Sequence, residues 1–237
     1  HTDVPSPGGD AVVAAGAITI AGGLNINTSG AGSTVTVNLD TSVLQPLTTA
    51  DGNSGVYALG VTNYTTDRFL HGYGTRNTFV GRQAGNLTLT TGSATNNTGI
   101  GSNALDSLTT GNSNTAVGRD ALTAVTSGSS NTAVGSSALD SVLNGTNNTG
   151  VGASSLAAVT SGDHNVGIGS DAGSSITTGG DNTAVGYQAL QSATTGYNSC
   201  AFGSGTLNSL TSGIRNSAFG KDSLAALTTG DENTAVG

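Results

Sequence analysis

The feature that most constrains this chain is a strict 17-residue repeat. The pentad Asn-Thr-Ala-Val-Gly occurs at residues 114–118, 131–135, 182–186 and 233–237, and close variants fill the intervening slots. The glycines that close these pentads recur at a constant spacing from Gly101 to Gly237. An earlier copy closes at Gly81, and the interval between Gly81 and Gly101 is longer than the others by a three-residue insertion. A fixed period of this length is typical of solenoids, in which each coil packs only on its neighbours.

Composition agrees with a repetitive fold that has a thin core. Glycine accounts for 38 of the 237 residues, and only 8% of the residues are charged. Much of the 35% apolar content is alanine rather than leucine or isoleucine. Disorder is the competing interpretation of such a composition, but the regular placement of Val and Leu argues against it.

The pentad predicts a short β-strand with two distinct faces. Because alternate residues of a strand point to opposite sides, the Thr and Val positions share one face and the Asn, Ala and Gly positions share the other. We call the aligned residues of successive repeats columns. The Val column is always apolar and mostly β-branched, which predicts a buried strand position. The Ala column holds only Ala or Gly from Gly99 to Ala235, which predicts a backbone close to that face. The Asn column predicts hydrogen-bonded ladders between coils.

Two apolar columns mark the second half of each coil. The Leu column contains Leu105, Leu122, Leu139, Leu156, Leu190, Leu207 and Leu224, and is interrupted at Gly173. A second column follows three positions later and contains Leu108, Val125, Val142, Val159, Ile176, Ala193, Leu210 and Leu227. This spacing suits either one helical or 3₁₀ turn before the next glycine or a second short bent strand.

The repeats also resemble known families. The segment Asn198-Ser199-Cys200-Ala201-Phe202-Gly203 resembles the Asn-Ser-x-Ala-Ile-Gly signature of trimeric autotransporter adhesin heads, which are parallel β-rolls with repeats of about 14 residues. The longer unit from Asn182 to Gly196 is more similar to bacterial and phage tail-fibre-domain proteins. The resemblance covers residues 77–237 and implies a trimeric surface or virion fibre without catalytic residues. The 17-residue period and the Thr column depart from the adhesin-head pattern.

These features predict an all-β fold, a parallel β-roll or β-solenoid of 17-residue coils that forms a homotrimer. A coil with two small or apolar faces has one face for its own interior and one for a neighbour. We divide the chain into an N-terminal linker and strand cap at 1–50, an aromatic-rich transition segment at 51–80 and the solenoid at 81–237. We also expect the chain to be a fragment of a longer protein.

Residues 10–40 predict a small β-meander. Residues 17–20, 24–27 and 34–39 alternate in polarity as strands do, and residues 22–23 and 29–32 supply the turns. A unit of this size is too small to be stable alone, so we expect it to complete a trimeric cap or to lead in from an upstream module.

Residues 51–80 provide the candidate ligand-binding site. They contain five of the nine aromatic residues together with charged side chains. Aromatic rings beside hydrogen-bonding groups bind sugars or proteins, although rings that fill a junction between two β modules explain the pattern as well. The candidate residues are Tyr57, Tyr64, Asp67, Arg68, Phe69, His71, Tyr73 and Arg76.

Several function classes are disfavoured. Six Lys and Arg in a chain of net charge −8 neutralise few phosphates, which argues against nucleic acid. No apolar stretch is long enough to insert into a membrane. We expect no catalytic residues, cofactor or metal site, because no nucleophile, phosphate-loop or zinc spacing is present and the Asp residues do not recur in one column as calcium solenoids require. His164 occupies a variable column and is expected to be exposed, and Cys200 is expected to be a small inward-facing residue.

The expected function is therefore that of an extracellular, cell-surface or virion fibre segment, not an enzyme, which presents a host, prey or glycan-binding region. The Thr-Thr-Gly series, such as Thr194-Thr195-Gly196, suggests an ice- or surface-binding solenoid as an alternative. A polysaccharide-degrading tailspike is a further alternative, since carboxylates from different chains could form a pair.

Overall fold

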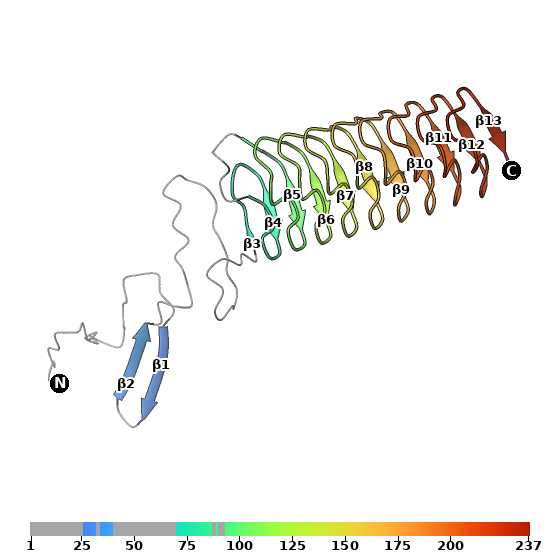
Figure 1. Ribbon diagram of the computed structural model, residues 1–237. Coiled ribbons are helices and arrows are strands. Elements are labelled where there is room, and N and C mark those ends of the chain that lie inside the picture. Colours follow the sequence, from blue (N-terminus) through green and yellow to red (C-terminus); the bar gives the residue numbers. More distant parts are fainter. Residues whose placement is uncertain (1–25, 32–33, 40–69, 87–88, 90–92) are drawn as a thin grey trace. The chain divides into compact units, whose positions relative to one another are not determined.

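The computed structural model describes residues 26–31, 34–39, 70–86, 89 and 93–237 (Figure 1). The chain divides into two compact units, His1–Pro46 and Leu47–Gly237. The first contains a hairpin of β1 (Ile26–Ala31) and β2 (Thr34–Leu39), and the second contains one sheet of eleven strands. The prediction of an all-β fold with a β-solenoid is confirmed.

The hairpin corrects one sequence-based boundary. Ser29, Gly30 and Ala31 pair with Thr36, Val35 and Thr34 in the antiparallel ladder, so they belong to β1 and not to the predicted turn at 29–32. The register leaves only positions 32 and 33 between the paired strands. A two-residue connection is the commonest in antiparallel hairpins. The predicted strand at 17–20 lies outside the described residues.

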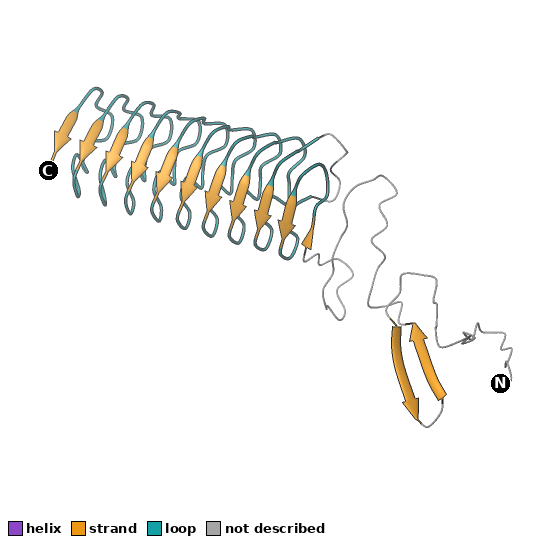
Figure 2. Cartoon of the chain, turned by 180° about the vertical axis from the view of Figure 1, so that it is seen from behind, coloured by secondary structure: helices purple, strands orange, loops and turns teal. Residues whose placement is uncertain are grey.

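The solenoid consists of ten parallel strands with one antiparallel strand at its edge (Figure 2). The antiparallel strand β3 (Leu70–His71) pairs with β4. The parallel strands are β4 (Thr78–Val80), β5 (Thr98–Ile100), β6 (Thr115–Val117), β7 (Thr132–Val134), β8 (Thr149–Val151), β9 (Val166–Ile168), β10 (Thr183–Val185), β11 (Cys200–Phe202), β12 (Ser217–Phe219) and β13 (Thr234–Val236). Equivalent residues of successive repeats are paired throughout the parallel strands, so each coil adds one strand to the sheet.

The Ala column, not the Val column, faces the interior of the coil. Ala116, Ala133 and Ala184 are fully buried, whereas Val134 and Ile168 are 38% and 42% exposed. The prediction that the Val column is buried is therefore wrong for the single chain. The prediction of a close backbone is confirmed, since a Cβ at Gly150 would lie 3.1 Å from the carbonyl oxygen of Ser155. Leu side chains from the opposite wall fill the narrow interior and leave room only for a methyl group.

The second half of the coil is a series of hydrogen-bonded turns, and among the described residues it is neither a helix nor a strand. In a representative coil, the amide of Ala121 donates to Gly118 and that of Val125 donates to Leu122. The amide of Leu122 instead donates to Ala138 of the next coil. The three-residue spacing of the two apolar columns thus reflects a single turn whose amides are shared with the neighbouring coil. Both columns are buried through most of the solenoid.

The coil depends on residues with positive φ. The closing glycines have φ between 116° and 141° from Gly81 to Gly237. The Leu column also has positive φ, for example 50° at Leu122 and 52° at Leu139. A bulky side chain in this region is uncommon, and complete burial of these two side chains offsets its cost. Gly173 occupies the same conformation without strain.

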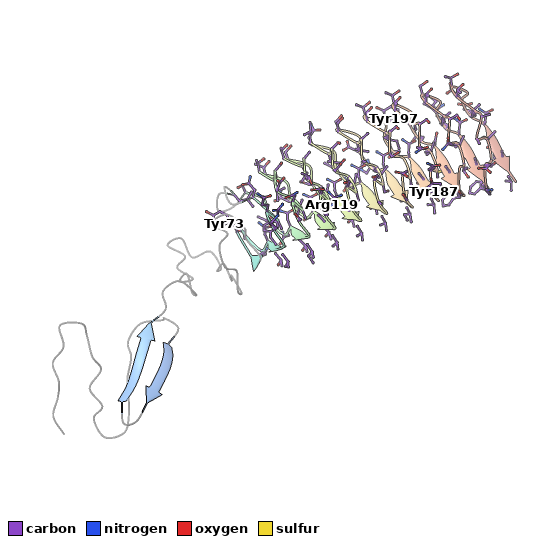
Figure 3. The ribbon with its side chains drawn as sticks, turned by 60° about the horizontal axis from the view of Figure 1, so that its bottom comes forward. Tyr73, Arg119, Tyr187 and Tyr197 are labelled. Carbon is purple, nitrogen blue, oxygen red and sulfur yellow. The ribbon has the colours of Figure 1, made fainter. Side chains whose placement is uncertain are left out.

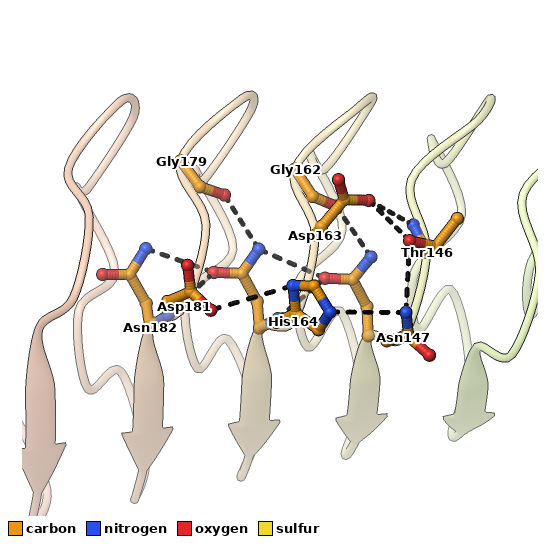
Figure 4. A network of polar contacts seen from close by, with 10 residues as sticks. Thr146, Asn147, Gly162, Asp163, His164, Gly179, Asp181 and Asn182 are labelled. Atoms are coloured by element: carbon orange, nitrogen blue, oxygen red, sulfur yellow. Dashed lines mark hydrogen bonds and ion pairs between the residues drawn. The ribbon is translucent and has the colours of Figure 1, made fainter.

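The Asn column forms the predicted ladder inside the solenoid. The side-chain amide of Asn165 donates to the Asn148 side-chain oxygen at 3.1 Å and to the Gly179 carbonyl at 2.8 Å, and the backbone amide of Asn165 donates to the same Asn148 oxygen at 2.9 Å (Figure 4). The pattern recurs through successive coils, and Asn114, Asn131, Asn148 and Asn165 have no exposed surface. A buried amide is tolerated because both its donors and its acceptor are satisfied.

Ser199 interrupts this ladder. Its hydroxyl accepts from the Asn216 amide at 3.3 Å, longer than the 2.8–3.2 Å that the Asn residues make elsewhere. The Asn216 side chain consequently donates only to the Gly230 carbonyl. The side-chain amide of a ladder asparagine also donates to the carbonyl of a glycine 14 residues later, as Asn182 does to Gly196. For position 199 the equivalent glycine is Gly213.

Restoring the missing rung should stabilise the protein. We expect Ser199→Asn to raise the free energy of unfolding by about 1–2 kcal/mol, because a new amide would bond to Asn182 and Gly213 and offer its oxygen to Asn216. Chemical denaturation followed by circular dichroism measures the change. Ser209→Asn, outside the ladder, is the control. Equal or lower stability of Ser199→Asn would show that the interior lacks space for the amide.

Candidate functional site

The most distinctive surface of the solenoid is the outer face of the sheet, formed by the Thr and Val columns. Every fully packed strand from β5 to β12 buries its central residue and leaves the two flanking residues half-buried or exposed. The large apolar side chains exposed here are Ile100, Val134, Ile168, Phe202, Phe219 and Val236. The Val column therefore displays a continuous row of apolar side chains, which forms an uncharged strip together with the mostly hydroxyl-bearing Thr column.

The outer face carries no charge in any of its Thr- and Val-column positions from Thr78 to Val236. Ten strands spaced about 4.8 Å apart make a strip about 43 Å long, and three-residue strands make it about 10 Å wide. The uncharged face therefore covers about 430 Å², of which the Val column is the apolar part; apolar patches of a few hundred Å² mark interaction sites on soluble proteins. The geometry suits a flat protein surface rather than a small ligand.

Cys200 lies on the outer face and not in the interior. It precedes buried Ala201 in β11 and is partly exposed. The prediction that it faces inward is wrong, because the interior belongs to the Ala column and alternate residues of a strand point to opposite sides.

The structure reaches only part of the aromatic-rich candidate site. Tyr57, Tyr64, Asp67, Arg68 and Phe69 lie outside the described residues. His71 is in β3, and Tyr73 is half-buried and packs against the core (Figure 3). Arg76 is exposed, with φ at 57°. These described residues do not by themselves define a binding site.

Phe79 has a structural role. It occupies the Ala-column position of the first coil and is fully buried. A Cβ at Gly85 would lie 2.3 Å from the Phe79 ring, so the glycine makes room for the aromatic side chain. Gly85 stands four residues after Gly81, where later coils have the Leu column, so the ring fills space that a leucine occupies elsewhere. For this residue the structure favours the junction-filling interpretation of the aromatic segment.

Polar contacts at the loop edge link neighbouring coils. The Asp163 carboxylate accepts from the backbone amide and hydroxyl of Thr146, at 2.6 and 2.9 Å. His164 lies 3.4 Å from the Asn147 amide and 3.7 Å from the Asp181 carboxylate (Figure 4). The His164 side chain is 59% exposed, as predicted. Across the described residues, no group of three or more His, Cys, Asp and Glu has the arrangement of a metal site.

The carboxyl group of Asp140 has a shifted pKa. Partial burial raises the pKa of Asp140 above its ordinary value, and the negative charge of Asp120 adds to the rise. The hydrogen bond that Ser141 donates at 3.1 Å opposes it. This cause is ordinary desolvation on a coil surface, so it assigns no catalytic role to Asp140. The tailspike alternative stays a prediction.

The Thr-Thr-Gly series is largely engaged in holding coils together. The hydroxyl of the first threonine donates to a backbone carbonyl of the next coil, as in Thr177 to Thr194 at 3.1 Å and Thr194 to Thr211 at 3.1 Å. The second threonine, such as Thr195, is exposed on the surface. The ice-binding alternative stays a prediction, with much of its hydroxyl array already used within the solenoid.

Sequence reasoning does not single out the exposed aromatic residues within the repeats. Tyr187 and Tyr197 are 55% and 43% exposed on different sides of neighbouring coils (Figure 3). The Tyr197 hydroxyl donates to the Thr178 carbonyl at 3.0 Å. The signal that could have found them is their position in the variable columns of the repeat.

Comparison of the chain with models of protein families, with curated proteins and with solved structures finds no match. Within the described residues, no helix has the length and hydrophobicity needed to cross a bilayer. The assignment of function therefore rests on the geometry of the solenoid.

Proposed function

We propose that this chain is a structural and adhesive fibre segment, a homotrimeric spacer that presents a binding region on an extracellular, cell or virion surface. The observation that carries the proposal is the apolar outer face of the sheet. A strip of this size without charge is costly to leave in water, and association of three copies would cover it.

The strip alone is small for an interface between two chains. About 430 Å² is roughly half of the area that one partner contributes to a standard protein interface, so contacts with a second neighbour would supply additional area. Around a three-fold axis parallel to the solenoid, each chain would bring its strip to the centre, and the loops flanking the sheet would add contacts with both neighbours. The inner face of each coil supplies a separate core, so the coils remain folded units within the assembly.

The oligomeric state tests the proposal. Sedimentation equilibrium of the chain should give three times the 22.8 kDa mass of one chain at micromolar concentration. The double variant Val134→Lys/Ile168→Lys should be monomeric with an unchanged circular dichroism spectrum, because two charges per chain would be buried without partners. Thr195→Lys, outside the sheet, should remain trimeric. A monomeric unmodified chain would refute the trimer.

The binding region is proposed within residues 51–80. Glycan arrays and cell-binding assays should detect a ligand for the trimer, and Arg68→Ala combined with Arg76→Asn should weaken that binding at least about tenfold by removing two cationic donors. Asparagine is chosen at position 76 because it tolerates the positive φ of Arg76. Binding that survives this double variant undiminished would place recognition elsewhere.

A further inference from the structure

Two adjacent strands of the outer face differ from the others. The Val column contains Val or Ile in eight of the ten parallel strands and phenylalanine in β11 and β12. The rings of Phe202 and Phe219 are stacked, with centroids 5.4 Å apart and planes within 5°. They are 39% and 42% exposed, so their burial within the single chain does not explain them. We call this pair the Phe double rung.

The Thr column changes at the same two strands. Cys200 and Ser217 stand beside the two rings, whereas the other eight strands carry threonine or valine at this position. The two columns share one face, so each large ring has an unbranched, smaller neighbour. A solvated face places no limit on side-chain volume, but a packed interface does. A larger side chain in the Val column is thus accompanied by a smaller one in the Thr column. This compensation indicates that another surface packs against the face and limits the total side-chain volume.

A face made only of Val and Ile would leave an assembly without a defined axial position. If copies are related by an axis parallel to the solenoid, each residue meets its own equivalent. A slip by one coil, about 4.8 Å, would bring nearly identical side chains into contact along most of the strip. Uniform ladders of this kind specify register weakly.

We propose that the Phe double rung fixes the axial register in which copies of this chain associate. The inference rests on the proposed homotrimer and names the residues that align it. A one-coil slip retains a phenylalanine contact at one rung and sets phenylalanine against a smaller side chain at the two flanking rungs. At both flanking rungs the side-chain volume then differs from that of the matched Phe–Phe and Val–Val rungs, and this mismatch disfavours the slipped assembly.

The register can be measured between labels at different axial levels on different chains. In a Cys200→Ser background, which copies the residue beside Phe219, one chain carries a nitroxide on Asn144→Cys and another carries a gadolinium label on Thr229→Cys, both in equivalent exposed turns. Double electron–electron resonance between the two label types should give a single narrow distance for three in-register chains. Phe202→Val/Phe219→Val should add shorter and longer distances, because a slip changes the axial separation of the labels directly and slipped assemblies would rise at least about tenfold in population.

Two further variants separate register from general interface damage. Ile100→Val/Ile168→Val trims the same face elsewhere and should keep the single distance. Moving the double rung by four coils, with Val134→Phe/Val151→Phe and Thr132→Ser/Thr149→Ser added to the Phe-to-Val variant, should restore it. An assembled variant without the rings that still gives one narrow distance would overturn the register proposal. A monomeric parent chain would instead overturn the homotrimer itself.

Discussion

Replacing Gly152 with alanine should destabilise the solenoid by about 4 kcal/mol or more, because a strained backbone and a steric overlap act together. Gly152 has φ at 132°, a conformation that costs an L-residue on the order of 1–3 kcal/mol. A Cβ there would also lie 2.5 Å from the carbonyl oxygen of Gly169 and 2.6 Å from its carbonyl carbon. Both atoms belong to the backbone of the next coil, so the overlap could be relieved only by separating two coils.

Gly150→Ala is the matched control for this substitution. Gly150 lies two positions earlier in β8 and belongs to the Ala column, where most coils already have alanine. Its Cβ would lie 3.1 Å from Ser155 and 3.2 Å from Leu139. These contacts are tight, but most other coils accommodate an alanine at the same column position. We expect this change to alter stability by less than about 1 kcal/mol. Urea denaturation followed by circular dichroism compares the two variants, and similar losses for both would refute the argument.

Removing one buried rung of the Asn ladder should cost about 3–4 kcal/mol, because several buried polar groups lose their partners at once. In Asn148→Ala, the Asn131 oxygen and the Gly162 carbonyl lose donors at 3.2 and 2.8 Å. The backbone and side-chain amides of Asn165 lose an acceptor at 2.9 and 3.1 Å. The Asn131 oxygen keeps the backbone amide of residue 148 and the Asn165 side chain keeps the Gly179 carbonyl, so the loss is concentrated in the Asn165 backbone amide and the Gly162 carbonyl. A buried group without a partner costs about 1–3 kcal/mol, although water that enters the vacated space would recover part of this loss.

Hydrogen exchange gives this prediction a local readout. Because each coil contacts only its neighbours, lost protection should be concentrated in the coils that contain residues 131–182. Asn144→Ala changes an exposed asparagine of the same coil and should be nearly neutral. A stability of Asn148→Ala equal to that of this control would mean that the ladder contributes little.

The period of the repeat is enough to predict much of this fold. Regular spacing of Gly101 to Gly237 implies stacked coils, and strand alternation places the Asn and Ala columns together on one face. The chemistry of asparagine then predicts the ladder that the structure contains. These conclusions can be drawn from the sequence because they depend on relations between neighbouring residues.

The candidate binding site is harder to predict from the sequence. Phe79 belongs to an aromatic segment that sequence patterning associates with recognition, yet it fills the interior of the first coil. Sequence reasoning predicts a second face for a neighbour but does not assign it to the Val column, because Val and Ile in a strand are usually buried and Phe202 belongs to the same column. Exposure depends on what covers a face, and local sequence does not contain that information.

The alternation of residues within a strand determines from the sequence which side chains share a face. Only the three-dimensional coil shows which of the two faces lies inside. A 17-residue coil is too narrow to hold both the Leu columns and a row of Val side chains opposite them. The interior therefore takes Ala133 and its equivalents, and Val134 turns outward with Cys200 and the phenylalanines. The same closure uses positive φ at Leu122 and its equivalents, where burial of the side chain offsets a backbone conformation that local propensity disfavours.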